Sequence, residues 1–245
     1  MSELNKSIKA IFFDLDETLI PENDCMLVAI RQTSKLLAER YTGIEPAQLE
    51  AAYFRASHDF WSESNNVPRA SGSGASGGNA IRIEVWGKAL SACNAEANRH
   101  AVVAAELYAQ ERKASYRLFP EVEDVLNTLR QQFVLGIITN GADTQREKLK
   151  NTSLNNLIDT VIISGEVGVG KPEGGIFVKA LSSVNVTPKE AIYVGDSLNL
   201  DIAGAKNARL FAVWLNRTQL SRPPNSPKPD SEINNLRELL VVLGL

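Results

Sequence analysis

Two aspartates near the amino terminus have the spacing of a catalytic carboxylate pair. Asp14 and Asp16 stand two residues apart, directly after the apolar segment 8–13. Because side chains alternate along an extended chain, residues two apart project to the same side. In an open parallel sheet, acidic residues just past a buried strand project into the crevice where ligands bind, so both are candidate catalytic residues. For this segment alone, a turn followed by a helix cap remains an alternative.

Two later segments carry groups that suit a phosphate. Thr139, Asn140 and Gly141 supply a hydroxyl and main-chain N–H groups at a tight turn, which are suitable donors to phosphate oxygens. Lys171 offers a positive charge, both for the phosphate and for the carboxylate of Asp14. These residues predict a site for phosphoryl chemistry.

Two further carboxylates suit a divalent cation. Asp196 and Asp201 follow the apolar run 191–194. Mg²⁺ typically keeps several waters and binds a few carboxylates together with substrate oxygens. The sequence therefore predicts a magnesium site that works together with the phosphate-binding groups.

Short apolar runs place all these residues at the ends of strands. The runs are continuous rather than alternating, which is typical of strands covered on both faces: residues 8–13, 134–138, 160–163, 191–194 and 210–215. Segments with helical spacing of apolar residues separate the later strands: residues 121–132, 175–184 and 199–208. The pattern predicts an α/β fold with a Rossmann-like parallel sheet and helices on both faces. Ligands of such sheets bind at the carboxyl ends of the strands.

The interval between the first two strands has a different pattern. Helical spacing runs through most of residues 21–118, which predicts a small helical domain inserted into an α/β core of residues 1–20 and 119–245. The Gly/Ser-rich segment 71–78 predicts a flexible loop within this insert, whose contact with substrate stays open. Residues 217–230 predict a surface crossing, and residues 233–243 a final helix.

The four motifs, in this order along the chain, resemble those of the haloacid dehalogenase-like superfamily. The helical insert is similar to the cap of one large branch of that family. Within the branch, segments 138–141, 144–149 and 165–172 are similar to N-acylneuraminate-9-phosphatase and the pyrimidine 5'-nucleotidases.

The resemblance implies a catalytic role for each core residue. Asp14 would attack phosphorus and form an aspartyl-phosphate. Asp16 would protonate the leaving alcohol and then activate water. Thr139, Asn140 and Lys171 would bind the transferring phosphoryl group.

The resemblance also implies a set of magnesium ligands. Asp14, the main-chain carbonyl of Asp16, and Asp196 would hold Mg²⁺, with Asp201 acting directly or through water. An acid at position 16 favours an oxygen leaving group, because a halide needs no proton. The implied activity is hydrolysis of a small phosphomonoester, such as a sugar phosphate or nucleoside monophosphate. The alternatives are a phosphomutase or a catalytically silent binding protein on the same scaffold.

Two glycine patterns are read as coincidences. Residues 165–171 fit Gly-x-x-x-x-Gly-Lys, but Pro172 replaces the hydroxyl residue and lacks the N–H that a P-loop uses. Residues 72–77 fit a dinucleotide-binding pattern but do not follow a strand.

Composition limits the partners of the chain. Its 245 residues carry a net charge of −3, which argues against a nucleic acid polymer as partner. No apolar stretch is long enough to cross a membrane and no signal peptide is visible, so we expect a cytoplasmic protein. Cys25 and Cys93 form no disulfide framework. We expect a small phosphorylated metabolite as partner; the oligomeric state cannot be read from the sequence.

Overall fold

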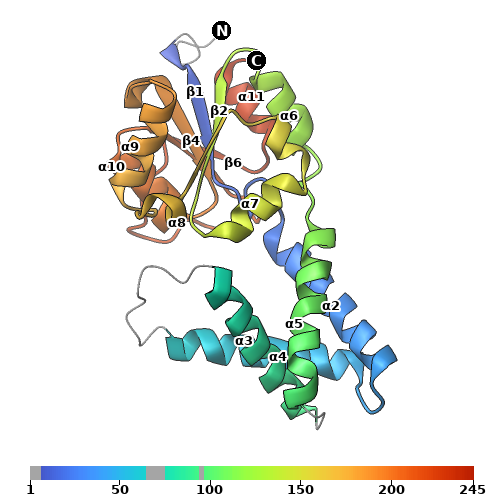
Figure 1. Cartoon of the computed structure of the whole chain (residues 1–245). Helices are drawn as coiled ribbons and strands as arrows, with labels where there is room; N and C mark the ends of the chain where they lie inside the picture. Colours follow the sequence, from blue (N-terminus) through green and yellow to red (C-terminus); the bar gives the residue numbers. More distant parts are fainter. Residues whose placement is uncertain (1–6, 65–74, 94–96) are drawn as a thin grey trace. The chain divides into compact units, whose positions relative to one another are not determined.

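The chain forms two compact units (Figure 1), and the computed structural model describes residues 7–64, 75–93 and 97–245 of it. Unit 1 comprises Met1–Pro21 and Arg117–Leu245, and unit 2 comprises Glu22–Tyr116. Unit 2 is therefore inserted into the sequence of unit 1. Within the described ranges, no helix is both long and apolar enough to span a membrane.

Unit 1 is built on a six-stranded sheet in the order β3-β2-β1-β4-β5-β6. All neighbouring strands are parallel. The strands are β1 (Ala10–Phe13), β2 (Val134–Thr139), β3 (Thr160–Ile163), β4 (Ala191–Gly195), β5 (Phe211–Leu215) and β6 (Ser231–Ile233). The predicted α/β fold is confirmed, and the five predicted strands are present.

The first strand lies in the middle of the sheet. Ala10 of β1 pairs with Val134 of β2 on one side and with Ala191 of β4 on the other. The order of strands reverses here, because β2 and β3 extend to one edge while β4, β5 and β6 extend to the other. A reversal of this kind opens a crevice at the carboxyl ends of the central strands.

Helices cover both faces of the sheet. Figure 1 shows α9 and α10 on one face, with α6 and α11 on the other. Phe177 of α9 packs edge-on against Tyr193 of β4 in one continuous apolar cluster. The helices of unit 1 are α6 (Val122–Leu129), α7 (Asp143–Lys150), α8 (Ser164–Val167), α9 (Gly174–Ser183), α10 (Ala203–Asn207) and α11 (Arg237–Leu243), with short turns η1 (Ser153–Asn156), η2 (Pro188–Glu190) and η3 (Leu198–Ile202).

Two predicted elements differ near the carboxyl terminus. The last helix begins at Arg237 rather than at residue 233, because Ser231–Ile233 pairs with β5 as a short edge strand. The predicted helix 199–208 begins as a π-turn, Leu198–Ile202, before it continues as α10. A short polar strand and a wider helical turn leave no distinct apolar pattern in the sequence.

Within its described residues, 22–64, 75–93 and 97–116, unit 2 forms four helices: α2 (Glu22–Arg40), α3 (Pro46–Ser64), α4 (Ala75–Ala92) and α5 (Ala97–Ser115). Its core contains a cluster of aromatic rings, in which Trp86 lies 4.5 Å from Tyr53 and 5.8 Å from Tyr108 between ring centroids. The predicted loop 71–78 is wrong in part. Residues 75–78 form the first turn of α4, which extends the helical pattern that follows them, and residues 71–74 lie outside the described residues.

The chain leaves and re-enters unit 1 at neighbouring points. After β1, residues 15–20 form a tight turn in which Glu17 adopts a left-handed conformation (φ 59°) and its N–H donates to the Ile20 carbonyl. On the return, the Phe119 N–H donates to the Leu19 carbonyl at 3.0 Å. The sheet thus remains continuous although unit 2 interrupts its sequence.

An ion pair stabilises this junction. Arg217 donates to the Glu121 carboxylate at 2.7 Å and to the Thr18 carbonyl at 2.9 Å. Its guanidinium lies over the Phe119 ring at 3.6 Å. Burial alone would raise the pKa of Glu121, but the hydrogen bonds from Arg217 and from main-chain N–H groups outweigh it and lower the pKa.

We expect Glu121→Gln to lower the free energy of unfolding by roughly 1–3 kcal/mol at pH 7, because it leaves Arg217 without its charged partner. A carboxylate with a lowered folded-state pKa stabilises above its unfolded pKa and loses that effect as pH falls through the folded value. Urea unfolding should therefore show the gap between variant and wild type narrowing below about pH 4. Glu123→Gln, at an exposed position of the same helix, is the control, and an equal loss there would contradict the assignment.

Candidate active site

The two aspartates of the first motif follow β1 directly. Asp14 is buried, with its N–H donating to the Val194 carbonyl at the end of β4, whereas Asp16 is half-buried. Both therefore lie at the carboxyl end of the central strand, where the order of strands reverses. This is the position at which open parallel sheets bind their ligands.

A buried lysine joins the first motif to the last. The Nζ atom of Lys171 donates to Asp14 at 2.5 Å and to Asp201 at 2.7 Å. It also lies 3.0 Å from the Tyr193 hydroxyl. That hydroxyl lies 2.9 Å from the same oxygen of Asp201 and 3.2 Å from the Ile138 carbonyl. Residues from four separate segments thus meet around one ammonium group.

Three carboxylates form a compact cluster. One oxygen from each of Asp14, Asp196 and Asp201 lies within 4.8 Å of the others. Gly195 makes the arrangement possible, because a Cβ atom there would lie 2.4 Å from the Asp201 carboxyl carbon. Asp201 comes from the π-turn, a local widening that often occurs at functional sites. Its second oxygen accepts from the Ser197 N–H at 2.9 Å.

Burial and mutual repulsion raise the pKa values of these acids. Burial, with a smaller contribution from neighbouring carboxylates, raises the pKa of Asp14 to about 8 although Lys171 opposes the shift. Burial and then the charge of Asp201 raise the pKa of Asp196 to about 6. Burial disfavours the charged form of Lys171, yet Asp14 and Asp201 outweigh it and raise the pKa of the lysine. The site holds more negative charge than its lysines balance.

The chemistry of this donor set fits Mg²⁺. Asp14, Asp196 and Asp201 offer oxygens only, in a cluster whose raised pKa values indicate uncompensated negative charge. A divalent cation is the natural counterion for such a group. Both oxygens of Asp201 already accept hydrogen bonds from the protein, whereas Asp14 and Asp196 are the better placed to contribute ligands.

Asp16 has a separate set of partners on α7. Lys148 donates to one of its oxygens at 2.7 Å, and Gln145 donates to the other at 3.0 Å. Gln145 also donates to the Thr139 hydroxyl at 2.7 Å. Thr139, at the end of β2, is therefore brought next to Asp16, as a phosphate-binding hydroxyl would need to be.

The side chain of Asn140 and the N–H of Gly141 make contacts within the protein. The Asn140 side chain accepts from the Lys171 N–H at 2.8 Å and donates to the Lys171 carbonyl at 3.0 Å. It therefore holds the backbone of the lysine in place. The N–H of Gly141 donates to the Ser164 hydroxyl at 3.0 Å, so this donor is engaged within the protein.

Three buried polar residues of the site were missed from the sequence. Tyr193 sits inside an apolar strand run and looks like core, while Gln145 and Lys148 look like part of a solvated charged segment. The spacing of Gln145 and Lys148, three apart, was the available signal, because such residues share one face of a helix.

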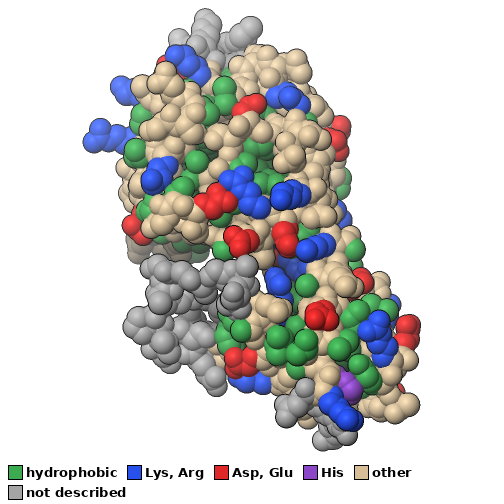
Figure 2. Space-filling model, in the orientation of Figure 1, with side chains coloured by type: hydrophobic (Ala, Val, Ile, Leu, Met, Phe, Trp, Pro, Cys, Tyr) green, Lys and Arg blue, Asp and Glu red, His purple; other side chains and the backbone are tan. Residues whose placement is uncertain are grey.

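Charged side chains also gather on the surface over this part of unit 1. Figure 2 shows acidic and basic groups side by side around α7 and α8. Arg146 of α7 makes a two-pronged contact with Glu166 of α8, at 2.8 and 2.7 Å. This exposed pair links the two helices that follow β2 and β3.

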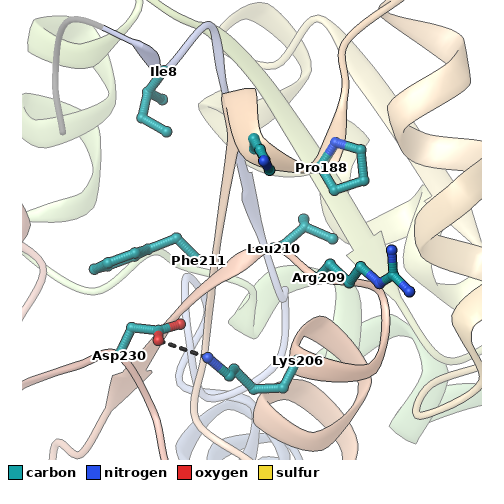
Figure 3. A pocket seen from close by; sticks show the side chains of 8 residues that line it. Ile8, Pro188, Lys206, Arg209, Leu210, Phe211 and Asp230 are labelled. Carbon is teal, nitrogen blue, oxygen red and sulfur yellow. Dashed lines mark hydrogen bonds and ion pairs between the residues drawn. The ribbon is translucent and has the colours of Figure 1, made fainter.

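A hollow lies at the opposite end of the strands from the carboxylate cluster (Figure 3). It is formed around the starts of β1, β4 and β5, away from the carboxylate cluster. Its one carboxylate is already paired, since Lys206 contacts Asp230 at 2.6 Å. The hollow is therefore not the candidate active site. It is lined by Ile8, Pro188, Lys189, Lys206, Arg209, Leu210, Phe211 and Asp230.

Comparison with known proteins gives consistent matches over almost the whole chain. The family model of haloacid dehalogenase-like hydrolases matches residues 8–209. A glyceraldehyde 3-phosphate phosphatase from Methanopyrus kandleri is 33% identical over 243 residues, covering 96% of this chain and 97% of that protein. The N-acylneuraminate-9-phosphatase of Homo sapiens is 29% identical over 244 residues, covering 96% of this chain and 94% of that protein.

The solved structures agree on the fold. The crystal structure of a putative hydrolase of this family, YfnB from Bacillus subtilis bound to magnesium, has a TM-score of 0.74 at 22% identity. It covers 97% of this chain and 99% of that one. The resemblance predicted from the four motifs, including the similarity to N-acylneuraminate-9-phosphatases, is confirmed.

Proposed function

The chain belongs to the haloacid dehalogenase-like hydrolase family, and we propose that it hydrolyses a small phosphomonoester with Mg²⁺, using Asp14 as nucleophile and Asp16 as general acid and base. The observation that supports the proposal is that the two aspartates after β1 have different hydrogen-bond partners. Asp14 is paired with the buried Lys171, while Asp16, two residues later, is held separately beside Thr139. A nucleophile and a proton carrier need different surroundings, and these two carboxylates have them.

In the first half-reaction an oxygen of Asp14 forms a bond to phosphorus as the bond from phosphorus to the ester oxygen breaks. Asp16, protonated at this stage, gives its proton to the departing alcohol. Lys171 and the Thr139 hydroxyl bind phosphoryl oxygens and stabilise the charge that spreads over them in the transition state. Asn140 supports the group by fixing the Lys171 backbone.

In the second half-reaction water attacks the phosphorus of the aspartyl-phosphate. Asp16, now a carboxylate, accepts a proton from that water while the bond between phosphorus and the Asp14 oxygen breaks. Inorganic phosphate leaves and both carboxyl groups return to their starting states. Asp16 thus loses a proton in the first half-reaction and regains one in the second, which completes the cycle.

The residues proposed to hold Mg²⁺ are Asp14, the main-chain carbonyl of Asp16, and Asp196. When bound, the cation would supply positive charge that reduces the repulsion between the anionic phosphate and the anionic nucleophile. Asp201 is not among these proposed ligands, because its oxygens already accept hydrogen bonds from Lys171, Tyr193 and Ser197. Its proposed role is to orient the Lys171 side chain.

The substrate class is a phosphate ester of an aliphatic alcohol. The relatives named above are phosphatases of glyceraldehyde 3-phosphate and of N-acylneuraminate 9-phosphate, whose leaving groups are alcohols that need a proton. Asp16 supplies one. We further propose that unit 2 acts as the cap that selects the substrate, and that the protein works in the cytoplasm.

A phosphate-release assay on the full chain tests the proposal. The panel would contain sugar phosphates, glyceraldehyde 3-phosphate, N-acylneuraminate 9-phosphate and pyrimidine nucleoside monophosphates, each with Mg²⁺. We expect inorganic phosphate from at least one of them. An isomerised phosphate ester without free phosphate would point to a phosphomutase, and the absence of any product across the panel would point to a binding protein.

A further inference from the structure

The carboxylate of Asp16 is held at both of its oxygens by one helix. Lys148 and Gln145 of α7 contact one oxygen each, at 2.7 and 3.0 Å. Both side chains are almost fully buried, with 4% of Lys148 and 2% of Gln145 exposed, whereas Asp16 is half-buried. Burying a lysine is unfavourable unless its charge is well paired. The burial of Lys148 next to Asp16 therefore differs from the exposure expected of a lysine on a solvated helix face.

The hydrogen bonds of Gln145 fix the orientation of its amide. Its Nε2 atom lies 3.0 Å from an Asp16 oxygen, 2.7 Å from the Thr139 hydroxyl oxygen and 3.2 Å from the Asn140 carbonyl. A carboxylate and a carbonyl only accept hydrogen bonds, so the NH₂ group must face them. Because this group donates to the Thr139 oxygen, the hydroxyl proton of Thr139 points away from Gln145. It donates to the Asn140 carbonyl at 3.4 Å, a long hydrogen bond that a phosphoryl oxygen can replace.

Gln145 packs closely against the backbone of the turn after β2, where a side chain at position 141 would clash with it. Gly141 has a φ of 150°, and a Cβ atom there would lie 2.7 Å from Cγ of Gln145. Helix α7 begins two residues later, so Gln145 and Lys148 come from its first two turns and share one face. The turn after β2 and the start of α7 together direct two donors at one carboxylate.

We propose that Gln145 and Lys148 are positioning residues that hold Asp16 at the leaving-group oxygen and, through Gln145, orient the Thr139 hydroxyl. This rests on the proposed phosphatase function and assigns two residues to its proton-transfer step. Neither residue touches the reacting atoms. Asp16 passes its proton to the ester oxygen as the bond to phosphorus breaks, and Lys148 and Gln145 restrict the orientations from which it can do so.

The leaving group provides a test that separates positioning from general damage. An alkyl phosphate needs a proton on its departing oxygen, whereas p-nitrophenyl phosphate releases a stable phenolate without one. The ratio kcat/KM covers binding and the steps up to alcohol release, so it includes the step in which Asp16 acts as an acid and leaves out the later step in which it acts as a base. Lys148→Met should lower kcat/KM for the best alkyl substrate of the panel by about 10- to 100-fold, and for p-nitrophenyl phosphate by less than about threefold.

Four companion variants keep the test decisive. Lys150→Met removes an exposed lysine from the same helix and should change neither substrate. Lys148→Arg should restore part of the alkyl activity. Gln145→Met, which removes the amide but keeps the length, should lower alkyl activity more than aryl activity and serves if Lys148→Met does not fold. Lys148→Met introduced into Asp16→Asn should cause no further loss with the alkyl substrate.

Equal losses with both substrates, or an additive loss in the double variant, would overturn the proposal. A wild-type protein that releases phosphate from neither substrate would instead overturn the phosphatase function itself. The two failures are therefore distinguishable.

Discussion

Asp14→Asn is expected to lower phosphate release by at least about 10⁴-fold, because removal of a covalent nucleophile leaves only the catalysis that binding and charge stabilisation provide. The amide matches the carboxylate in size but cannot form an acyl phosphate. The measurement is the steady-state rate of phosphate release from the best substrate with saturating Mg²⁺. In a single-turnover experiment, acid quenching should trap a phosphorylated protein with the wild type and none with the variant.

The same variant should stay folded. Burial raises the pKa of Asp14 to about 8, so the folded state binds a proton at this site more tightly than the unfolded chain does. Such a group weakens the fold as pH rises from about 4 towards 8, and a neutral side chain removes that effect. The melting temperature of Asp14→Asn in chelator should thus be no lower than that of the wild type at pH 8. Retained turnover in a correctly folded variant would refute the assignment of the nucleophile.

Chelation is expected to have the second large effect. EDTA should reduce turnover to the level of Asp14→Asn, and added Mg²⁺ should restore it, because the carboxylate cluster would otherwise repel an anionic substrate. Asp196→Asn should raise the Mg²⁺ concentration for half-maximal activity by at least about tenfold. Glu123→Gln, at an exposed position on α6, is the control for a general loss of negative charge. Full activity in EDTA would contradict the magnesium site.

The affinity for Mg²⁺ should also depend on pH. Protons compete with the metal for Asp14 and Asp196, whose pKa values are raised to about 8 and about 6. As pH rises from 6 to 8, these carboxylates lose their protons and the half-saturating Mg²⁺ concentration should fall. A half-saturating concentration that does not change over this range would show that the two acids are not ligands.

The central part of the site could be predicted from the sequence because it follows a simple rule. Asp14, Thr139 and Asp196 each come directly after an apolar strand run, and the carboxyl ends of parallel strands meet at one edge of a sheet. At these positions the strand pattern in the sequence is therefore enough to place the residues at one edge of the sheet. This prediction does not require the hydrogen-bond partners of the side chains to be known.

The supporting residues could not be predicted in this way. Tyr193 contributes its hydroxyl to the lysine and carboxylate group, yet it lies in a strand where an aromatic residue is ordinary core. Lys148 is buried beside Asp16, which lies far away in sequence. The π-turn that carries Asp201 has the composition of an α-helix. Each depends on long-range contacts, which the sequence pattern does not encode.

The bond between Phe119 and Leu19 has an evolutionary consequence. Since this hydrogen bond holds the two ends of the insertion close together, the inserted segment is equivalent, for the sheet, to one surface loop of any length. Lengthening such a loop adds only slowly to the entropy of closing it. A lineage could therefore replace or trim unit 2, the proposed cap, while the proposed active site at the end of β1 stays in place. A short linker from residue 20 to residue 118 should accordingly yield a folded miniature of unit 1.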